Sequence, residues 1–111
     1  MLIYKENLPI DTLDIVKISL PFEKAEDAAK AVLHVAEQRG VPCMWYDADS
    51  KITEEKKEFY IVAIGTGHYW KDILKKEQYI GTILTFGESL VLHYFIVNPE
   101  DFKDYIEIKD V

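Results

Sequence analysis

Hydrophobic residues occur along this chain in short runs of the length that is typical of β-strands, and charged or turn-forming residues separate the runs. Pro21 and the pair Asn98-Pro99 each follow such a run and are expected to end a strand, because proline cannot donate the hydrogen bond that a strand interior needs. Between the last two runs, Gly87-Glu88 is typical of a two-residue hairpin turn. The pattern predicts strands over residues 2–10, 14–20, 41–47, 59–64, 79–86 and 89–97.

One stretch, residues 23–38, is ambiguous between helix and strand. Its first half has the composition of a helix, and by propensity one helix could run through the whole stretch and end at Gly40. The β-branched valines on both sides of His34 instead favour a strand over residues 31–38. We expect a short helix that leads into a strand.

Two charged segments complete the pattern. Residues 48–58 are expected to form a hairpin loop, and the Lys-rich residues 70–78 are expected to form a surface helix or an irregular loop. The fold class that follows is α+β, a mostly antiparallel β-sheet with one or two short helices.

The composition is that of one globular domain, which we place over residues 1–111. Hydrophobic residues make up 49% of the chain, so it can bury a core without metals or disulfides. There is no run of about 18 apolar residues to cross a membrane, and Lys5 and Glu6 interrupt the apolar run that a signal peptide would need. Cys43 is the single cysteine, so an internal disulfide is excluded and a reducing cytoplasm is expected.

The formal charge of −7 argues against a protein that binds the DNA or RNA backbone, because such proteins normally carry a clustered basic surface. The charge is uneven: residues 99–111 carry two lysines against five acids, whereas residues 65–98 carry three lysines and three acids. A small anion could therefore bind within residues 65–98 without opposing the field of the whole protein. The simpler alternative is that this neutral segment belongs to the core.

A glycine-rich motif, Gly65-Thr66-Gly67-His68, follows the apolar run of residues 59–64. Two glycines around a threonine at a strand end allow a sharp turn with exposed amide hydrogens, and the histidine can donate or accept a hydrogen bond. The only arginine, Arg39, is expected at another strand end, where it could grip a phosphate. Alternatively, the glycines only form turns and Arg39 pairs with an acid such as Glu37. The residues predicted to bind a ligand are Gln38, Arg39, Gly65, Thr66, Gly67, His68, Tyr79 and Thr82.

The residues give less support to metal binding or catalysis. His34, His68, His93 and Cys43 follow no spacing known for metal ligands. His34 and His93 lie in apolar runs, where a hydrogen-bonded core histidine is commoner, and Cys43 is expected to be a buried, inert thiol. No paired carboxylates stand beside the histidines, so we predict no metal site, no cofactor and no catalytic residue.

Five motifs occur in order along the chain: Ile3-Tyr4-Lys5, the stretch from His34 to Trp45, Gly65-Thr66-Gly67-His68, Tyr79-Ile80-Gly81-Thr82, and Leu90-Val91-Leu92-His93-Tyr94-Phe95. Together they resemble a family of small proteins of unknown function found mainly in bacteriophage genomes. The resemblance covers residues 2–97 and implies a phage origin and a fold, but no reaction. The segment 22–31 is longer than in typical members, and residues 98–111 form an acidic C-terminal extension.

Small phage proteins outside the virion often act on the host, either by sequestering nucleotide immune signals or by blocking a defence protein. We therefore expect a non-enzymatic anti-defence protein of the host cytoplasm that binds a nucleotide-like small molecule and contacts no membrane. The alternative is a direct inhibitor of a host defence protein, which would dock through the acidic runs at residues 54–55 and 100–110.

The expected oligomeric state depends on the last strand. Residues 90–97 are apolar on both faces, and the short helices can cover only one face of a small sheet. A homo-oligomer that buries the second face is therefore expected, unless the C-terminal segment folds back to cover it.

Overall fold

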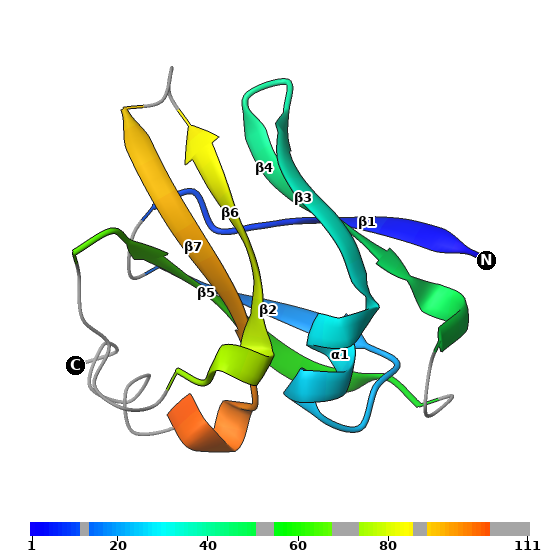
Figure 1. The fold of residues 1–111 in the computed structure, drawn as a ribbon. Helices are drawn as coiled ribbons and strands as arrows, with labels where there is room; N and C mark the ends of the chain where they lie inside the picture. The colour runs from blue at the N-terminus through cyan, green and yellow to red at the C-terminus, as the bar shows by residue number, and fades with distance from the viewer. Residues whose placement is uncertain (12–13, 51–54, 68–73, 86–88, 103–111) are drawn as a thin grey trace.

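The computed structural model describes residues 1–11, 14–50, 55–67, 74–85 and 89–102, and it contains two antiparallel β-sheets and short helices (Figure 1). The three-stranded sheet has the order β1-β4-β3, with β1 at Ile3–Asn7, β4 at Val41–Asp47 and β3 at Val32–Gln38. The four-stranded sheet has the order β2-β5-β7-β6, with β2 at Ile15–Leu20, β5 at Lys57–Gly65, β7 at Leu90–Val97 and β6 at Tyr79–Thr85. The predicted α+β class, a mostly antiparallel sheet with short helices, is confirmed.

Local sequence explains the helix and the strand that follows it. Helix α1 (Ala25–Ala31) buries alanines three residues apart, which is the spacing of one helix face. Acidic residues lie in its first turn and Lys30 in its last, as the helix dipole favours. Val32 already has an extended backbone and begins β3, so the expected short helix leading into a strand is confirmed. Two 3-10 turns, η1 (Ala48–Ser50) and η3 (Lys76–Gln78), precede later strands.

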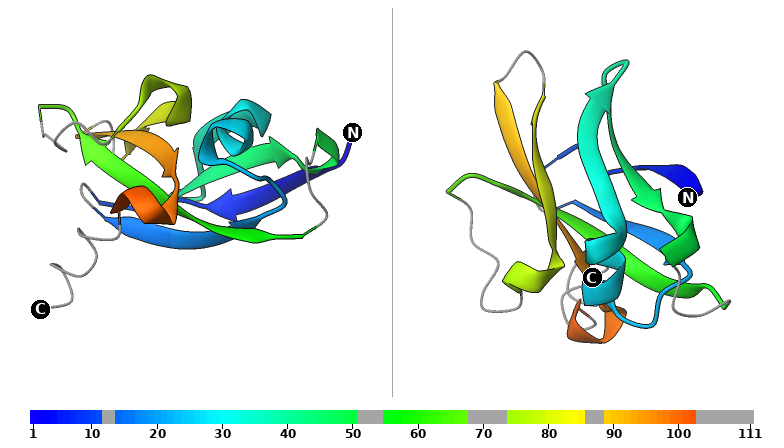
Figure 2. Two further views of the ribbon diagram at one scale, coloured as in Figure 1. Left: turned by 90° about the horizontal axis from the view of Figure 1, so that it is seen from below. Right: turned by 45° about the vertical axis from the view of Figure 1, so that its right-hand side comes forward.

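The main core lies between the two sheets, and α1 covers it at one end by packing against β7, β6 and β3 (Figures 1 and 2). Alternate residues of β7 point into this core, where Leu92, Tyr94 and Ile96 are fully buried. The Tyr94 hydroxyl donates a hydrogen bond to the carbonyl oxygen of Pro9 at 2.8 Å, and burial raises the pKa of this phenol. The polar end of this large side chain is therefore satisfied inside the core.

The two sheets approach each other most closely where β3 passes β6. Gly81 of β6 has φ +147, and a side chain added there would overlap the Cγ2 methyl of Val35 on β3. The pairing of β6 with β7 also shifts register between Tyr79 and Gly81. The glycine of the Tyr79-Ile80-Gly81-Thr82 motif therefore permits close packing of the two sheets.

A second, smaller cluster covers the outer face of the four-stranded sheet, the face turned away from the main core. Tyr60, Val62, Val97 and Phe102 are buried in it, and Phe95 packs against it. Phe102 lies just beyond β7, so the chain itself supplies cover for the second face of that strand. A second copy of the chain is therefore not needed to cover this face, and the homo-oligomer stays a prediction.

Some details of the predicted pattern are wrong. Residues 48–58 do not form a hairpin, because β1 and β3 already occupy both sides of β4 and the chain crosses to the other sheet, where β5 pairs with β2 and β7. Strand β1 is shorter than predicted because it ends before the buried Leu8 and Pro9. The turn at residues 87–88 lies outside the described residues, although Thr85 pairs with Leu90 in the register that such a turn requires.

Candidate functional site

A row of hydrogen-bonded polar side chains crosses the outer face of the four-stranded sheet, with His93 of β7 at its centre. In the strand register, His93 pairs with Ile64 of β5 and with Thr82 of β6. The Thr66 hydroxyl lies 2.7 Å from His93 Nε2, and the Thr82 hydroxyl lies 2.8 Å from His93 Nδ1. Both ring nitrogens are therefore engaged by threonine hydroxyls on neighbouring segments.

The row continues to an exposed aromatic ring. The hydroxyl of Tyr79 is hydrogen-bonded to that of Thr82. The centroids of the Tyr79 and Phe95 rings lie 5.5 Å apart, and the two ring planes form an angle of 60°. Tyr79 remains 44% exposed. We call Thr66, His93, Thr82 and Tyr79 the hydroxyl–histidine row.

The turn after β5 positions the first member of this row. Gly65 is the last residue of β5, where it is buried and pairs with Leu92, whereas Gly67 has φ +88 in the following turn. A side chain at Gly67 would meet no atom of the described residues within 4 Å, apart from its own chain neighbours. Gly67 therefore forms the sharp turn expected of this motif, whereas Gly65 has no positive φ because it still belongs to the strand. His68 lies outside the described residues.

The chemistry of the hydroxyl–histidine row is hydrogen bonding without fixed charge. Each hydroxyl can donate or accept, and a neutral imidazole has one nitrogen that donates and one that accepts. The row can therefore adapt its donors and acceptors to a bound polar group, while the exposed face of Tyr79 offers a surface for a planar ring.

The structure does not bring Gln38 and Arg39 to this row. They lie at the tip of the β3–β4 hairpin, in the three-stranded sheet, which projects separately from the end of β5 (Figure 1). Arg39 and Gly40 both have positive φ, 52° and 81°, as a type I′ hairpin turn requires. Gln38 accepts a hydrogen bond from Lys5 Nζ at 2.8 Å, so its amide is engaged across the same sheet. Gln38 and Arg39 therefore do not lie together with Thr66, Tyr79 and Thr82, because they turn within the other sheet.

The other candidate residues are spread over different faces. His34 is exposed, contrary to the expectation of a core histidine, and its ring lies 5.9 Å from the ring of Trp45. Cys43 is buried, as expected, and its thiol lies 3.4 Å from the carbonyl oxygen of Val41. Among the described residues, no three His, Cys, Asp or Glu side chains gather in a group that could hold a metal.

His93 was not among the predicted ligand-binding residues, although its sequence position carries a signal. Within residues 90–97 it alternates with Leu92 and Tyr94, and it is the only strongly polar side chain of that apolar strand. The polarity of this residue is a signal from which one could predict that His93 lies on the outer face of the four-stranded sheet. Its partners Thr66 and Thr82 become visible only from the register of three strands.

The chain belongs to a family whose model, described as "Domain of unknown function (DUF7352)", matches residues 1–103. This description names no activity. No curated protein and no solved structure matches the chain. In the part of the chain that the structure describes, no helix is long and apolar enough to cross a membrane.

Proposed function

We propose that this protein is a non-catalytic binding protein that holds the planar base of a nucleotide-like ligand against the outer face of β5, β7 and β6. The observation that carries the proposal is the hydroxyl–histidine row, which links two strands and a turn and ends at the exposed ring of Tyr79. A base could stack on Tyr79 and exchange hydrogen bonds with the hydroxyls along the row.

The row favours recognition of the base over recognition of the phosphate. It contains no lysine or arginine, and Arg39 lies on the other sheet. The exposed backbone of the turn at Gly67 could donate hydrogen bonds to an anion, but a neutral donor contributes less than a charged one. We therefore expect a nucleoside and its phosphorylated forms to bind with similar affinity.

We extend the proposal to the setting that the ordered sequence motifs suggest, a phage protein acting in the host cytoplasm. There, a protein that binds a nucleotide signal without converting it would lower the free concentration of that signal. This role needs no catalytic group, and it agrees with an imidazole that is hydrogen-bonded at both nitrogens.

The proposal is tested by a thermal-shift screen against adenosine, AMP, ADP-ribose and a cyclic dinucleotide, followed by calorimetry on any ligand that raises the melting temperature. Replacing Tyr79 by Ala should weaken binding by about tenfold or more, because stacking of a base on an aromatic ring is worth roughly 1–3 kcal/mol. Thr82→Val should weaken it as well, because it removes the central hydroxyl of the row.

The matched control is Tyr4→Ala, since Tyr4 is 48% exposed but lies on the three-stranded sheet. This variant should bind like the unmodified protein. Failure of every ligand to stabilise the protein, or equal binding by the Tyr79 and Tyr4 variants, would contradict the proposal.

A further inference from the structure

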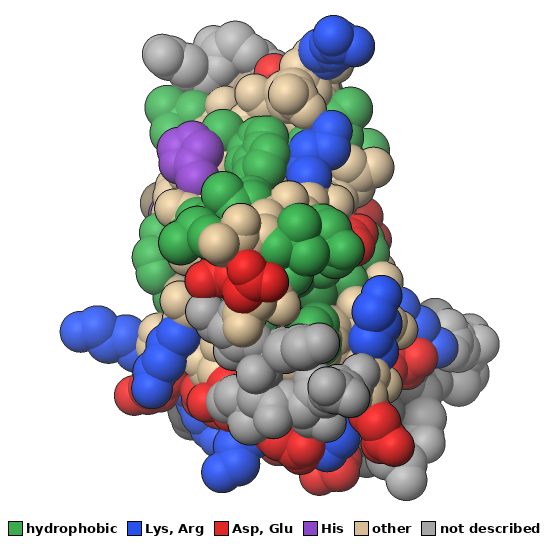
Figure 3. All heavy atoms as spheres, turned by 90° about the vertical axis from the view of Figure 1, so that its right-hand side faces the viewer, with side chains coloured by type: hydrophobic (Ala, Val, Ile, Leu, Met, Phe, Trp, Pro, Cys, Tyr) green, Lys and Arg blue, Asp and Glu red, His purple; other side chains and the backbone are tan. Residues whose placement is uncertain are grey.

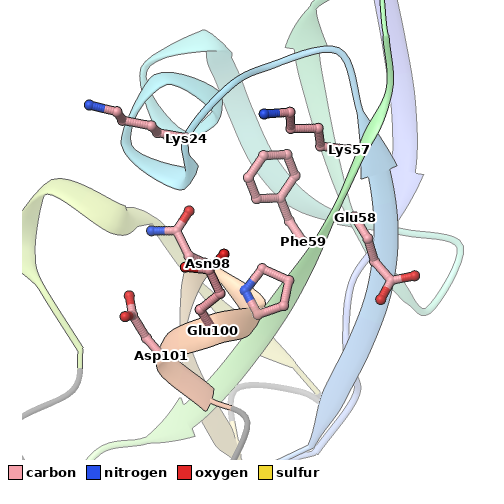
Figure 4. A pocket seen from close by; sticks show the side chains of 8 residues that line it. Lys24, Lys57, Glu58, Phe59, Asn98, Glu100 and Asp101 are labelled. Carbon is pink, nitrogen blue, oxygen red and sulfur yellow. The ribbon is translucent and has the colours of Figure 1, made fainter.

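A hollow of about 380 Å³ lies at the opposite end of the sheet from the hairpin tips, between the start of β5, the residue that precedes α1 and the first residues after β7 (Figure 4). Of the predicted ligand-binding residues that the structure describes, none lines it. Its apolar wall comes from Phe59 and Pro99, and Phe59 belongs to the main core and is only 2% exposed. The hollow therefore has a fixed apolar floor that could seat one small aliphatic side chain.

The walls of the hollow are held in place by hydrogen bonds between segments distant in sequence. The Asn98 side chain accepts a hydrogen bond from the backbone N–H of Ala25 at 2.9 Å, which joins the end of β7 to the start of α1. The backbone N–H of Asp101 donates to the carbonyl oxygen of Asn98 at 3.1 Å. These two hydrogen bonds tie the rim at residues 98–101 to the start of α1.

The first lysine at the rim is already neutralised. Lys57 Nζ lies 2.6 Å from a carboxylate oxygen of Glu23. The hydrogen bond and charge of Glu23 raise the pKa of Lys57, and the charges of Glu55 and Glu100 raise it further. Three carboxylates therefore act on this one ammonium group.

The remaining charge at the rim is negative. Glu100 and Asp101 are both exposed, and within the described residues neither carries a salt bridge, whereas Lys24 is the one other lysine among the described residues that line the hollow. Figure 4 shows Lys24 above the hollow and Asp101 below it, on the same side. Figure 3 shows that charged side chains gather toward this end of the molecule, while hydrophobic side chains are more frequent toward the other end.

We infer that the hollow is a docking site for a basic peptide segment of a partner protein. An aliphatic side chain of the segment rests against Phe59 and Pro99, and a neighbouring lysine or arginine pairs with Glu100 and Asp101. Opposite charge at the rim, together with the formal charge of −7, speeds the encounter and sets the orientation, while the apolar contact holds the bound segment. Lys24 disfavours a second basic residue on its own side of the hollow.

The test is a titration of the isotope-labelled protein with three blocked pentapeptides. Binding is monitored by NMR spectra of the backbone amides. The first is Gly-Lys-Leu-Arg-Gly, the second replaces its leucine by glycine, and the third replaces both basic residues by glutamate. The first peptide should shift the amides of residues 57–59 and of Asn98, Glu100 and Asp101, with weaker binding as salt rises from about 20 mM to about 500 mM. The second and third should bind more weakly, because one loses the apolar anchor and the other meets like charge.

The protein variant that matches this test is Glu100→Gln with Asp101→Asn, which keeps shape and removes both charges. It should bind the first peptide about fivefold more weakly at low salt, as expected for two exposed ion pairs. Its control is Glu37→Gln with Glu77→Gln, the same change of net charge at two exposed acids outside the hollow, and this control should keep its affinity. Equal binding of all three peptides, shifts confined to other residues, or equal losses in the two double variants would overturn the inference.

Discussion

Substitution of Gly81 by alanine gives a prediction whose magnitude follows from the contact between the two sheets. The added methyl would overlap Cγ2 of Val35, and the backbone at φ +147 is one that L-residues rarely adopt. Overpacking of this kind costs about 1–3 kcal/mol and an unfavourable backbone about 1–2 kcal/mol, so we expect a loss of about 2–5 kcal/mol. The free energy of unfolding of a small domain is only about 5–15 kcal/mol. Urea denaturation, monitored by circular dichroism, should therefore resolve the change easily.

Two further variants separate the steric cost from the backbone cost. Gly67→Ala has the positive φ but open space around it, so it should lose only about 1–2 kcal/mol. Val35→Ala removes the methyl that collides, and the remaining Val35 Cβ would lie 3.4 Å from the new methyl at position 81. Combined with Gly81→Ala, it should therefore recover about 1–3 kcal/mol relative to the sum of the single losses. Strict additivity, or equal losses for Gly81→Ala and Gly67→Ala, would refute the steric explanation.

Three other substitutions test separate parts of the fold by the same urea assay. Phe102→Ala should cost about 3–5 kcal/mol, because this fully buried ring covers the outer face of the four-stranded sheet; a loss below 1 kcal/mol would show that it does not. Arg39→Asn should raise stability by up to about 1 kcal/mol, since asparagine suits the positive φ before Gly40, and should leave nucleotide binding unchanged. A hydrogen bond to the backbone, followed by weaker contributions from Gln78 and Lys75, lowers the pKa of Glu26 below its ordinary 4.5. The ionised Glu26 therefore stabilises the fold above pH 4.5, and this contribution is lost as pH falls through the lowered pKa. Glu26→Gln should flatten the pH dependence of the free energy of unfolding in this range. An unchanged acid transition would contradict the role given to Glu26.

Local patterns in the sequence were sufficient to predict most of the strands. The strand after α1 is an example: the valines around His34 favour extended backbone, and the buried alanines before them favour a short helix. Residues 89–97 were also predictable, because a long apolar run bounded by a proline has few other structures available. These signals act between near neighbours in the chain, so no knowledge of the partner strand is needed.

The division into two sheets could not be read from the sequence. Strand β4 lies between β1 and β3, so β5 must pair elsewhere, and this depends on contacts between residues far apart in the chain. The candidate site was only partly predictable for the same reason. Thr66, Tyr79 and Thr82 were predicted as ligand-binding residues. His93 lies beside them only because of the register of β5, β7 and β6. Arg39 lies away from them because its hairpin belongs to the other sheet.

The central claim is that the hydroxyl–histidine row binds a base, and amide shift mapping with AMP and adenosine tests it most directly. We predict that both ligands shift the backbone amides of Thr66, Tyr79, Thr82 and His93, to similar extents for the two ligands, and leave residues 37–40 at the hairpin tip unchanged. Shifts centred on Arg39, or an amide spectrum that neither ligand alters at millimolar concentration, would contradict the account.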